Sequence, residues 1–224
     1  MSIETGATPS ASIGVLGAGT MGGAIARALA AKGLPVLVAN SRGPETLAEF
    51  ASAHPGHLLP VTLEEAGEAD IVILTVPWVA VEGVLGRLPA WEDRILVDAS
   101  NAVVFLAPDS PELNDPANPL AAMGLKPADT QGRTSSEIVS ELAPGARVVK
   151  TFNHIEPQVL AEPRRAGGQS VVFLSGDDAA ARYEITGLLE ALGLFAVDLG
   201  PLSVGAPLTA FPGGPLLGLD LLKP

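Results

Sequence analysis

The sequence contains no cysteine and few cationic residues. With no cysteine among its 224 residues, disulfides, thiolate metal ligands and thiol catalysis are excluded, which is compatible with the cytoplasmic location that we expect. Lysine and arginine number 13 against 25 aspartates and glutamates, for a formal net charge of −12, so we expect neither nucleic acid nor an anionic membrane surface as partner. No apolar run is long enough to cross a bilayer. Residues 1–11 lack a secretory signal pattern and are expected to be a flexible leader.

A glycine-rich turn is the most informative motif that is present. Residues 12–23 read SIGVLGAGTMGG, in which Gly17, Gly19 and Gly22 have the G-x-G-x-x-G spacing of a dinucleotide-binding turn. The first glycine permits a tight turn off a strand, the second lets the backbone approach a pyrophosphate, and the third lets helix and strand pack closely. The N–H groups and dipole of the helix that begins here favour the same anion. Because a turn selected only for packing can share this spacing, the flanking segments must decide between the two interpretations.

Strand and helix patterns alternate along most of the chain. Buried-strand patterns occupy residues 13–16, 34–39, 58–61, 71–76, 94–98, 147–153, 170–175 and 194–199. Helix signals lie at 20–32 and 45–53, from Thr62, from Pro77, at 134–144, and from Asp177 to Gly193. This order predicts an α/β fold, a Rossmann-type doubly wound, mostly parallel sheet with a small C-terminal extension. We expect residues 12–153 to form the nucleotide-binding domain and residues 154–224 a strand–helix–strand extension packed on the same domain.

Two segments carry weaker signals. Residues 102–130 are rich in proline, alanine, aspartate and asparagine without periodicity, and are expected to form a long loop. The last residues contain leucines at 216, 217, 219, 221 and 222, which must be buried somewhere. We therefore expect a homodimer.

The residues after the second predicted strand discriminate between cofactors. An NAD-binding unit usually has an acidic residue here, about 20 residues past the glycines, to bind the ribose 2′-hydroxyl. This chain has Asn40, Ser41 and Arg42 followed by Gly43-Pro44. A serine hydroxyl, a guanidinium and a new helix start suit a 2′-phosphate, which favours NADP(H) over NAD. The alternative is a solvated loop arginine.

Four motifs together resemble a known family. Gly17-Ala18-Gly19-Thr20-Met21-Gly22, Asn40-Ser41-Arg42, Val149-Lys150-Thr151-Phe152-Asn153 and Phe211-Pro212-Gly213-Gly214-Pro215-Leu216 resemble the NADP oxidoreductase, coenzyme F420-dependent family. Its F420:NADP oxidoreductases are similar from about Ile13 to Leu222, and so is the cytosolic domain of the STEAP metalloreductases. The resemblance implies an NADPH-dependent oxidoreductase that transfers hydride between NADP(H) and a stacked flavin or deazaflavin. As acceptor the resemblance implies FMN, FAD, coenzyme F420 or a ferric chelate.

The resemblance also implies site residues. It places Thr20 and Met21 at the pyrophosphate and nicotinamide, and Ser41 and Arg42, next to Asn40, at the 2′-phosphate. It places Thr75, Val76 and Pro77 along the cofactor, Ala99, Ser100 and Asn101 near the nicotinamide, and Thr151, Phe152, Asn153 and residues 212–215 around the second ring. Trp78, beside Pro77, is either a wall of the cofactor site or a core aromatic residue.

No catalytic residue and no metal site are predicted. Hydride transfer between stacked rings needs little from side chains, because the cofactors carry the chemistry. His154 is the one acid–base candidate, with a structural histidine as the alternative. Two rival functions stay open: a non-catalytic NADP(H)-sensing regulatory protein, and an imine or hydroxyacid dehydrogenase. The dehydrogenase families append a large helical domain, whereas the residues after position 153 contain two further strands.

Overall fold

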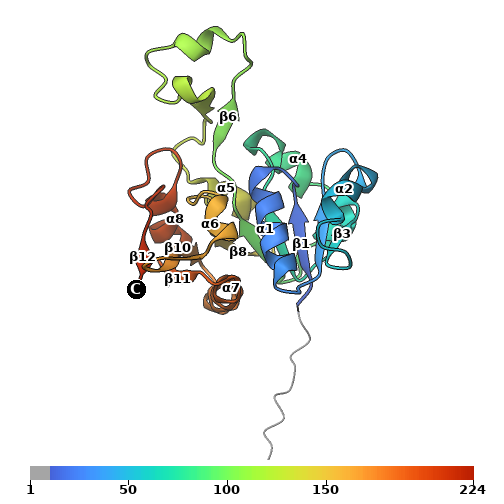
Figure 1. The fold of residues 1–224 in the computed structure, drawn as a ribbon. Helices are drawn as coiled ribbons and strands as arrows, with labels where there is room; N and C mark the ends of the chain where they lie inside the picture. The colour runs from blue at the N-terminus through green and yellow to red at the C-terminus, as the bar shows by residue number, and fades with distance from the viewer. Residues whose placement is uncertain (1–10) are drawn as a thin grey trace, which may run out of the picture.

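The computed structural model describes residues 11–224, so the expected leader lies outside the described residues except for Ala11. Within that range the main sheet has ten strands (Figure 1). Six of them are parallel neighbours in the order β3-β2-β1-β4-β5-β8. Their bounds are β1 Ile13–Leu16, β2 Val36–Ala39, β3 Leu58–Pro60, β4 Ile71–Leu74, β5 Ile95–Asp98 and β8 Arg147–Lys150. This is the strand order of a Rossmann sheet, which confirms the predicted fold class.

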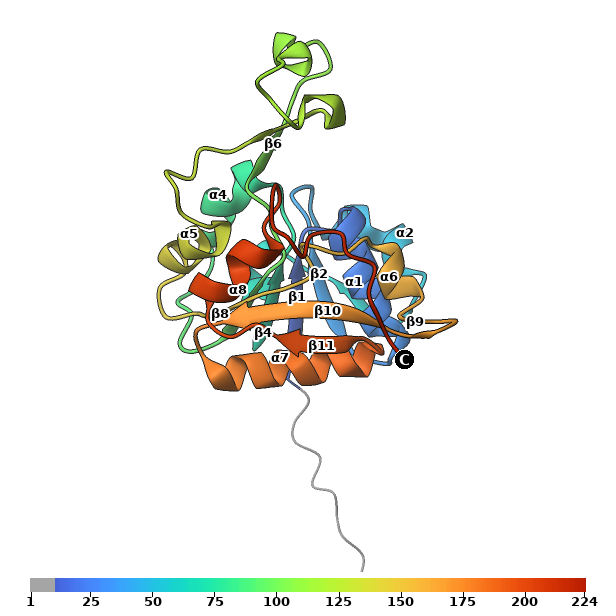
Figure 2. The same cartoon turned by 90° about the vertical axis from the view of Figure 1, so that its left-hand side faces the viewer.

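The residues after 153 extend the same sheet. β10 (Gly168–Gly176) pairs antiparallel with β8, and β11 (Phe195–Asp198) pairs parallel with β10. Two short strands, β9 (Arg164–Arg165) and β12 (Leu222–Lys223), also pair antiparallel with β10. Figure 2 shows α7 (Ala179–Leu192) running beside β11 at this edge. The predicted strand over 147–153 ends at Lys150, because Phe152 takes a positive φ of 65°.

Helices cover both faces of the sheet, which is why its strands are continuous apolar runs. On one face α1 (Thr20–Ala31), α6 (Gln158–Ala161) and α7 pack in a single hydrophobic cluster. On the other face α3 (Leu63–Gly67), α4 (Val81–Leu85), α5 (Ser135–Leu142) and α8 (Leu202–Thr209) pack in a second one. Alternate strand residues divide between them: Val15 and Ile73 face the first cluster, Leu16 and Leu74 the second. No helix in residues 11–224 combines the length and apolar character that a membrane span requires.

Helix starts follow the sequence signals with small differences. Thr134 forms the capping box that its sequence predicts, and Thr62, which was expected to cap its helix, forms a capping box as well. The cap of α7 was predicted one residue too early, since Asp178 accepts the N–H of Ala181. Asp177 instead accepts the N–H of Leu202, at the start of α8. The predicted helix over 45–53 is a 3₁₀ turn, η1 (Pro44–Leu47), followed by the short α2 (Ala48–Ala51).

Residues 103–127 form an arm that projects from the body in Figures 1 and 2. The expectation of a plain loop is wrong, because β6 (Val103–Phe105) and β7 (Leu125–Pro127) pair antiparallel at its base. Two 3₁₀ turns, η3 (Pro111–Asn114) and η4 (Ala121–Met123), lie between them. The strands are too short, and too far apart in the chain, to give a hairpin signal. Leu219 and Leu221 remain exposed near the C-terminus, so the homodimer stays a prediction.

Candidate functional site

A cavity of about 970 Å³ opens at the carboxyl ends of β1, β4 and β5. The chain reverses its direction of winding between β1 and β4, and ligands of open α/β sheets bind at such a switch point. The cavity is lined by most of the predicted site residues: Gly17, Gly19, Thr20, Met21, Asn40, Ser41, Arg42, Thr75, Val76, Pro77, Ala99, Ser100 and Asn101. Gly22, Thr151 and Asn153 do not line it.

The turn from β1 into α1 is locked against β4. Gly17 has a φ of 107° and donates its N–H to the carbonyl of Ala39 at 2.9 Å. The hydroxyl of Thr75 lies 2.8 Å from the carbonyl oxygen of Gly17. A Cβ on Gly22 would come within 1.9 Å of that same oxygen, whereas a Cβ on Gly19 would meet nothing within 4 Å. Gly22 therefore sets the helix–strand packing, while Gly19 leaves space open to a ligand.

The start of α1 faces this cavity with free donors. Its N-cap, Gly19, has no side chain to accept the N–H groups of the first turn. Thr20 and Met21 begin the helix and line the cavity. Unsatisfied first-turn N–H groups and the positive end of the helix dipole favour an anion at this position.

Asn40 organises the loop after β2. Its Nδ2 donates to the Thr46 hydroxyl at 2.9 Å, and its Oδ1 accepts the N–H of Arg42 at 2.9 Å. The Thr46 hydroxyl in turn donates to the carbonyl of Gly43 at 2.7 Å. Asn40 thus uses its amide to shape the loop and leaves Ser41 and Arg42 exposed at the cavity edge. Within residues 11–224, Arg42 makes no ion pair.

Three charged side chains near the cavity were not among the residues predicted for the site. The carboxylate of Glu45 lies over Gly43, since a Cβ there would come within 2.5 Å of Glu45 Oε1. Glu64 and Arg87 line the cavity and form an ion pair, with Arg87 Nη2 2.6 Å from Glu64 Oε1. A backbone N–H and the Arg87 guanidinium hold the pKa of Glu64 below its usual value. No motif marks this pair, because Glu64 belongs to α3 and Arg87 to the turn after α4, 23 residues further along the chain.

A buried ion pair fixes the turn after β5. Asp98 is fully buried; its Oδ1 accepts the N–H and hydroxyl of Ser100 at 2.9 and 2.6 Å. Its Oδ2 accepts the Lys150 ammonium at 3.0 Å and the Ser136 hydroxyl at 2.9 Å. Lys150 also donates to the Ser100 carbonyl and, at 3.2 Å, to the Ser135 hydroxyl. Burial lowers the pKa of Lys150, an effect that the charge of Asp98 opposes. Every charged atom of the pair has a partner, so the turn that presents Ser100 to the cavity is rigidly held.

Asn153 supports the cavity wall from behind, whereas Thr151 ties the end of β8 to β10. Asn101 donates from Nδ2 to the Asn153 carbonyl at 2.9 Å, and Asn153 donates from Nδ2 to Asn101 Oδ1 at 3.0 Å and to the Thr209 carbonyl at 2.8 Å. The Thr151 hydroxyl donates to the carbonyl of Phe173 at 2.8 Å. These two residues are buried beneath the cavity wall, and residues 212–215 do not line the cavity either. Their place in a second-ring pocket stays a prediction.

Trp78 satisfies both interpretations given from the sequence. It belongs to η2 (Trp78–Ala80), the 3₁₀ turn that precedes α4, and packs against the second hydrophobic cluster. It also lines the cavity beside Pro77 and Ala80. A core aromatic residue can therefore serve as a wall of the site.

His154 has a structural role. Its Nε2 accepts the N–H of Phe173 at 3.0 Å, and only 4% of its surface is exposed. Burial, assisted by the charge of Lys150, lowers its pKa to about 4. The ring is therefore neutral near pH 7 and has its acceptor nitrogen occupied, which leaves it unsuited to acid–base catalysis.

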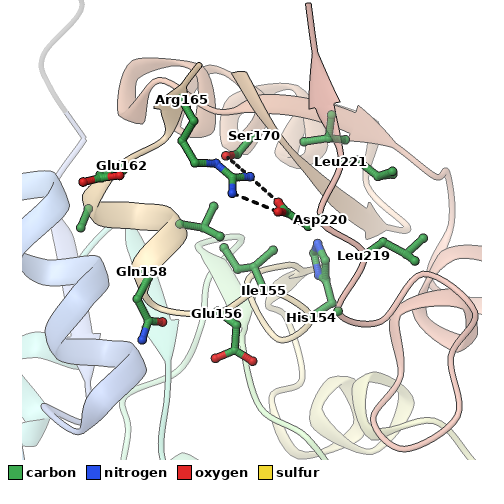
Figure 3. Close-up of a pocket in the computed structure, with 14 residues that line it drawn as sticks. His154, Ile155, Glu156, Gln158, Glu162, Arg165, Ser170, Leu219, Asp220 and Leu221 are labelled. Atoms are coloured by element: carbon green, nitrogen blue, oxygen red, sulfur yellow. Dashed lines mark hydrogen bonds and ion pairs between the residues drawn. The ribbon is translucent and has the colours of Figure 1, made fainter. Parts of the chain in front are cut away.

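A second cavity, of about 640 Å³, lies between α6 and the C-terminal segment (Figure 3). Arg165 in its wall pairs through its guanidinium with both carboxylate oxygens of Asp220 and reaches the Ser170 hydroxyl at 3.3 Å (Figure 3). His154 lines this cavity and not the one at the switch point. In the described part of the chain, no three histidine, aspartate or glutamate residues are grouped to hold a metal ion.

Known proteins resemble this chain at several distances. A family model described as NADP oxidoreductase coenzyme F420-dependent matches residues 12–102. The crystal structure of a hypothetical protein from Sinorhizobium meliloti is 39% identical, with 96% of each chain covered and a TM-score of 0.82. A structure from Arthrobacter sp. FB24, described as a candidate F420-dependent NADP-reductase, is 29% identical over 86% of each chain, with a TM-score of 0.64. The metalloreductase STEAP3 of Rattus norvegicus is 23% identical over 89% of this chain, which spans only 36% of STEAP3.

Two glycine variants separate packing from ligand approach in the β1–α1 turn. Gly22→Ala places a methyl group against the Gly17 carbonyl and the Thr75 hydroxyl, so we expect a loss of about 1–3 kcal/mol in the free energy of unfolding, as for other forced overpacking. Gly19→Ala has free space and a negative φ of −73°, so only the weaker N-cap preference of alanine should act, a loss of about 1 kcal/mol or less. Urea unfolding measures both changes. Equal losses for the two variants would contradict the assigned roles.

The burial of His154 predicts an acid-dependent loss of stability. Its pKa is about 4 in the folded protein against 6.5 in the unfolded chain. Above pH 6.5 both states are neutral; as the pH falls toward 4 only the unfolded state binds the proton, which removes about 3 kcal/mol of stability.

Urea unfolding between pH 7 and pH 4 tests this prediction. His154→Gln keeps an acceptor for the Phe173 N–H but cannot titrate, so its stability should fall less steeply than that of wild type. The control His57→Gln should follow the wild-type curve. Parallel curves for wild type and His154→Gln would show that folding does not lower the pKa of His154, and would contradict the prediction.

Proposed function

Because the chain belongs to the NADP oxidoreductase, coenzyme F420-dependent family, we propose that it is an NADPH-dependent oxidoreductase that binds NADP(H) in the switch-point cavity. We propose further that it exchanges a hydride with a flavin or deazaflavin. The observation that carries this proposal is one continuous cavity, with the free N–H groups of α1 in its wall and the exposed Ser41 and Arg42 at its edge. These are donors for a pyrophosphate and for a second phosphate.

The charges around the cavity fit an anionic nucleotide. The ionisable residues that line it are Arg42, Arg87 and Glu64, and the Glu45 carboxylate lies over Gly43 at its edge. These four charges cancel, whereas the whole protein has a formal net charge of −12, so this region is less acidic than the protein as a whole. An acidic protein that binds a phosphate-bearing ligand needs such a local departure from its overall charge. Arg87 is paired with Glu64, which leaves Arg42 as the cation available to the 2′-phosphate.

Side chains near Ala99, Ser100 and Asn101 can position a ligand but do not act as proton donors. When bound, NADPH supplies a hydride from its nicotinamide ring. The Ser100 hydroxyl donates to Asp98, and the Asn101 amide is paired with Asn153. The lining residues include no histidine, lysine or tyrosine as a proton donor. Reduction of a carbonyl or an imine needs a positioned proton, whereas a flavin or deazaflavin exchanges its proton with solvent. The lining therefore supports a ring-shaped hydride acceptor over a dehydrogenase substrate.

Turnover assays test the function. Oxidation of NADPH should be seen at 340 nm with FMN, FAD or a deazaflavin as acceptor. A ferric chelate should be tested as a further acceptor, because the related rat STEAP3 is a metalloreductase. Tight NADPH binding without turnover of any acceptor would contradict the enzyme and favour an NADP(H)-sensing protein.

Arg42→Ala tests the nucleotide preference. Removing the guanidinium should cost about 1.5–3 kcal/mol of NADPH binding free energy, the usual range for a charge-assisted hydrogen bond, and leave NADH binding nearly unchanged. Calorimetric titration of both nucleotides measures the difference. The exposed Arg164→Ala is the matched control, because Arg164 lies on β9 and does not line the cavity. A similar loss for NADPH and NADH would overturn the 2′-phosphate assignment.

A further inference from the structure

Phe105 is an aromatic side chain that the fold leaves uncovered. It ends β6 in the arm, opposite Leu125 of β7, and 70% of its surface is exposed. The arm has a small core of its own, formed by Val103, Leu120 and Leu125 with Phe211 packed against it, and Phe105 is not part of that core. Exposing a phenyl ring forfeits the hydrophobic stabilisation that burial would supply.

The Phe105 side chain belongs to the wall of the switch-point cavity. Val103 and Phe105 stand on the same face of β6, because side chains alternate along a strand, and both line the cavity. The arm leaves the body directly after Asn101, so Phe105 lies on the side of the cavity formed by residues 99–101. β6 also contacts η2, whose Trp78 lines the same cavity. Two aromatic side chains from separate elements therefore border one opening.

We propose that Phe105 is the platform on which the flat ring of the hydride acceptor stacks. The inference rests on the proposed function, and it adds the residue that would hold the isoalloxazine or deazaflavin ring of that acceptor. Stacking against a flat aromatic ring would cover the exposed phenyl face. It would also hold the acceptor at the end of the cavity where the residue pair Ala99 and Ser100 permits close approach.

The reaction that this arrangement serves is balanced without a further reagent. NADPH gives up a hydride, which is one proton with two electrons, and becomes NADP⁺. The acceptor ring gains the hydride at N5 of a flavin or C5 of a deazaflavin, and takes one proton from solvent at N1. Phe105 forms and breaks no bond; it positions the acceptor.

A binding measurement without turnover tests the proposal. FMN is titrated into protein saturated with NADP⁺, which cannot supply a hydride, and quenching of FMN fluorescence reports the dissociation constant. Phe105→Ala should raise that constant about tenfold, as for other aromatic stacking platforms, and Phe105→Tyr should restore it. The matched control is Met123→Ala, which removes another exposed apolar side chain from the same arm without touching the cavity wall; 62% of Met123 is exposed.

The outcomes separate this inference from the proposed function. Failure of the wild type to bind NADP⁺ would overturn the proposed function itself. If the wild type binds NADP⁺ and FMN but Phe105→Ala binds FMN as tightly, the platform is wrong and the function stands. An equal loss of NADP⁺ affinity in Phe105→Ala would assign Phe105 to the nucleotide and also overturn the platform. A shift from dimer to monomer in Phe105→Ala, with FMN binding unchanged, would assign the phenyl ring to contact with a second copy of the chain.

Discussion

The ion pair between Asp98 and Lys150 is the interaction on which the site depends. It joins the ends of two neighbouring parallel strands, β5 and β8, and both side chains are almost completely buried. Breaking a buried pair by removing one partner typically costs about 3–5 kcal/mol, because a charge is left uncompensated. Because the same Asp98 carboxylate accepts hydrogen bonds from Ser100, the buried pair also holds the turn at residues 98–101 in place.

The rest of the site is assembled around that fixed turn. Asn101 is held by Asn153, so the end of β8 supports the wall that the end of β5 presents. At the other end of the cavity Thr75 ties β4 to the glycine turn, and Asn40 shapes the loop that exposes Arg42. These polar side chains therefore use their hydrogen bonds to hold the loops and turns of the site in place. What stays free is the set of N–H groups at α1 and the guanidinium of Arg42, both suited to phosphates.

The sequence predicted those parts of the structure that local patterns encode. Runs such as Ile71–Leu74 identify strands covered on both faces, and Thr62 and Thr134 mark helix starts, because each signal lies within a few residues. The glycine turn and the Asn40–Arg42 loop were located for the same reason. The Glu64–Arg87 pair and the Lys150 network could not be predicted, since their partners meet only after the strands are ordered in the sheet. The arm was missed because β6 and β7 are short and far apart in the chain.

We propose that a 2′-phosphorylated dinucleotide lies across the switch point, from the start of α1 to the loop after β2. A crystal structure of the protein with NADP⁺ would decide this. We expect the pyrophosphate on the N–H groups of Thr20 and Met21, and the 2′-phosphate within hydrogen-bonding distance of Ser41 and Arg42. A nucleotide bound in the cavity beside α6, or one whose 2′-phosphate lies away from Arg42, would contradict it.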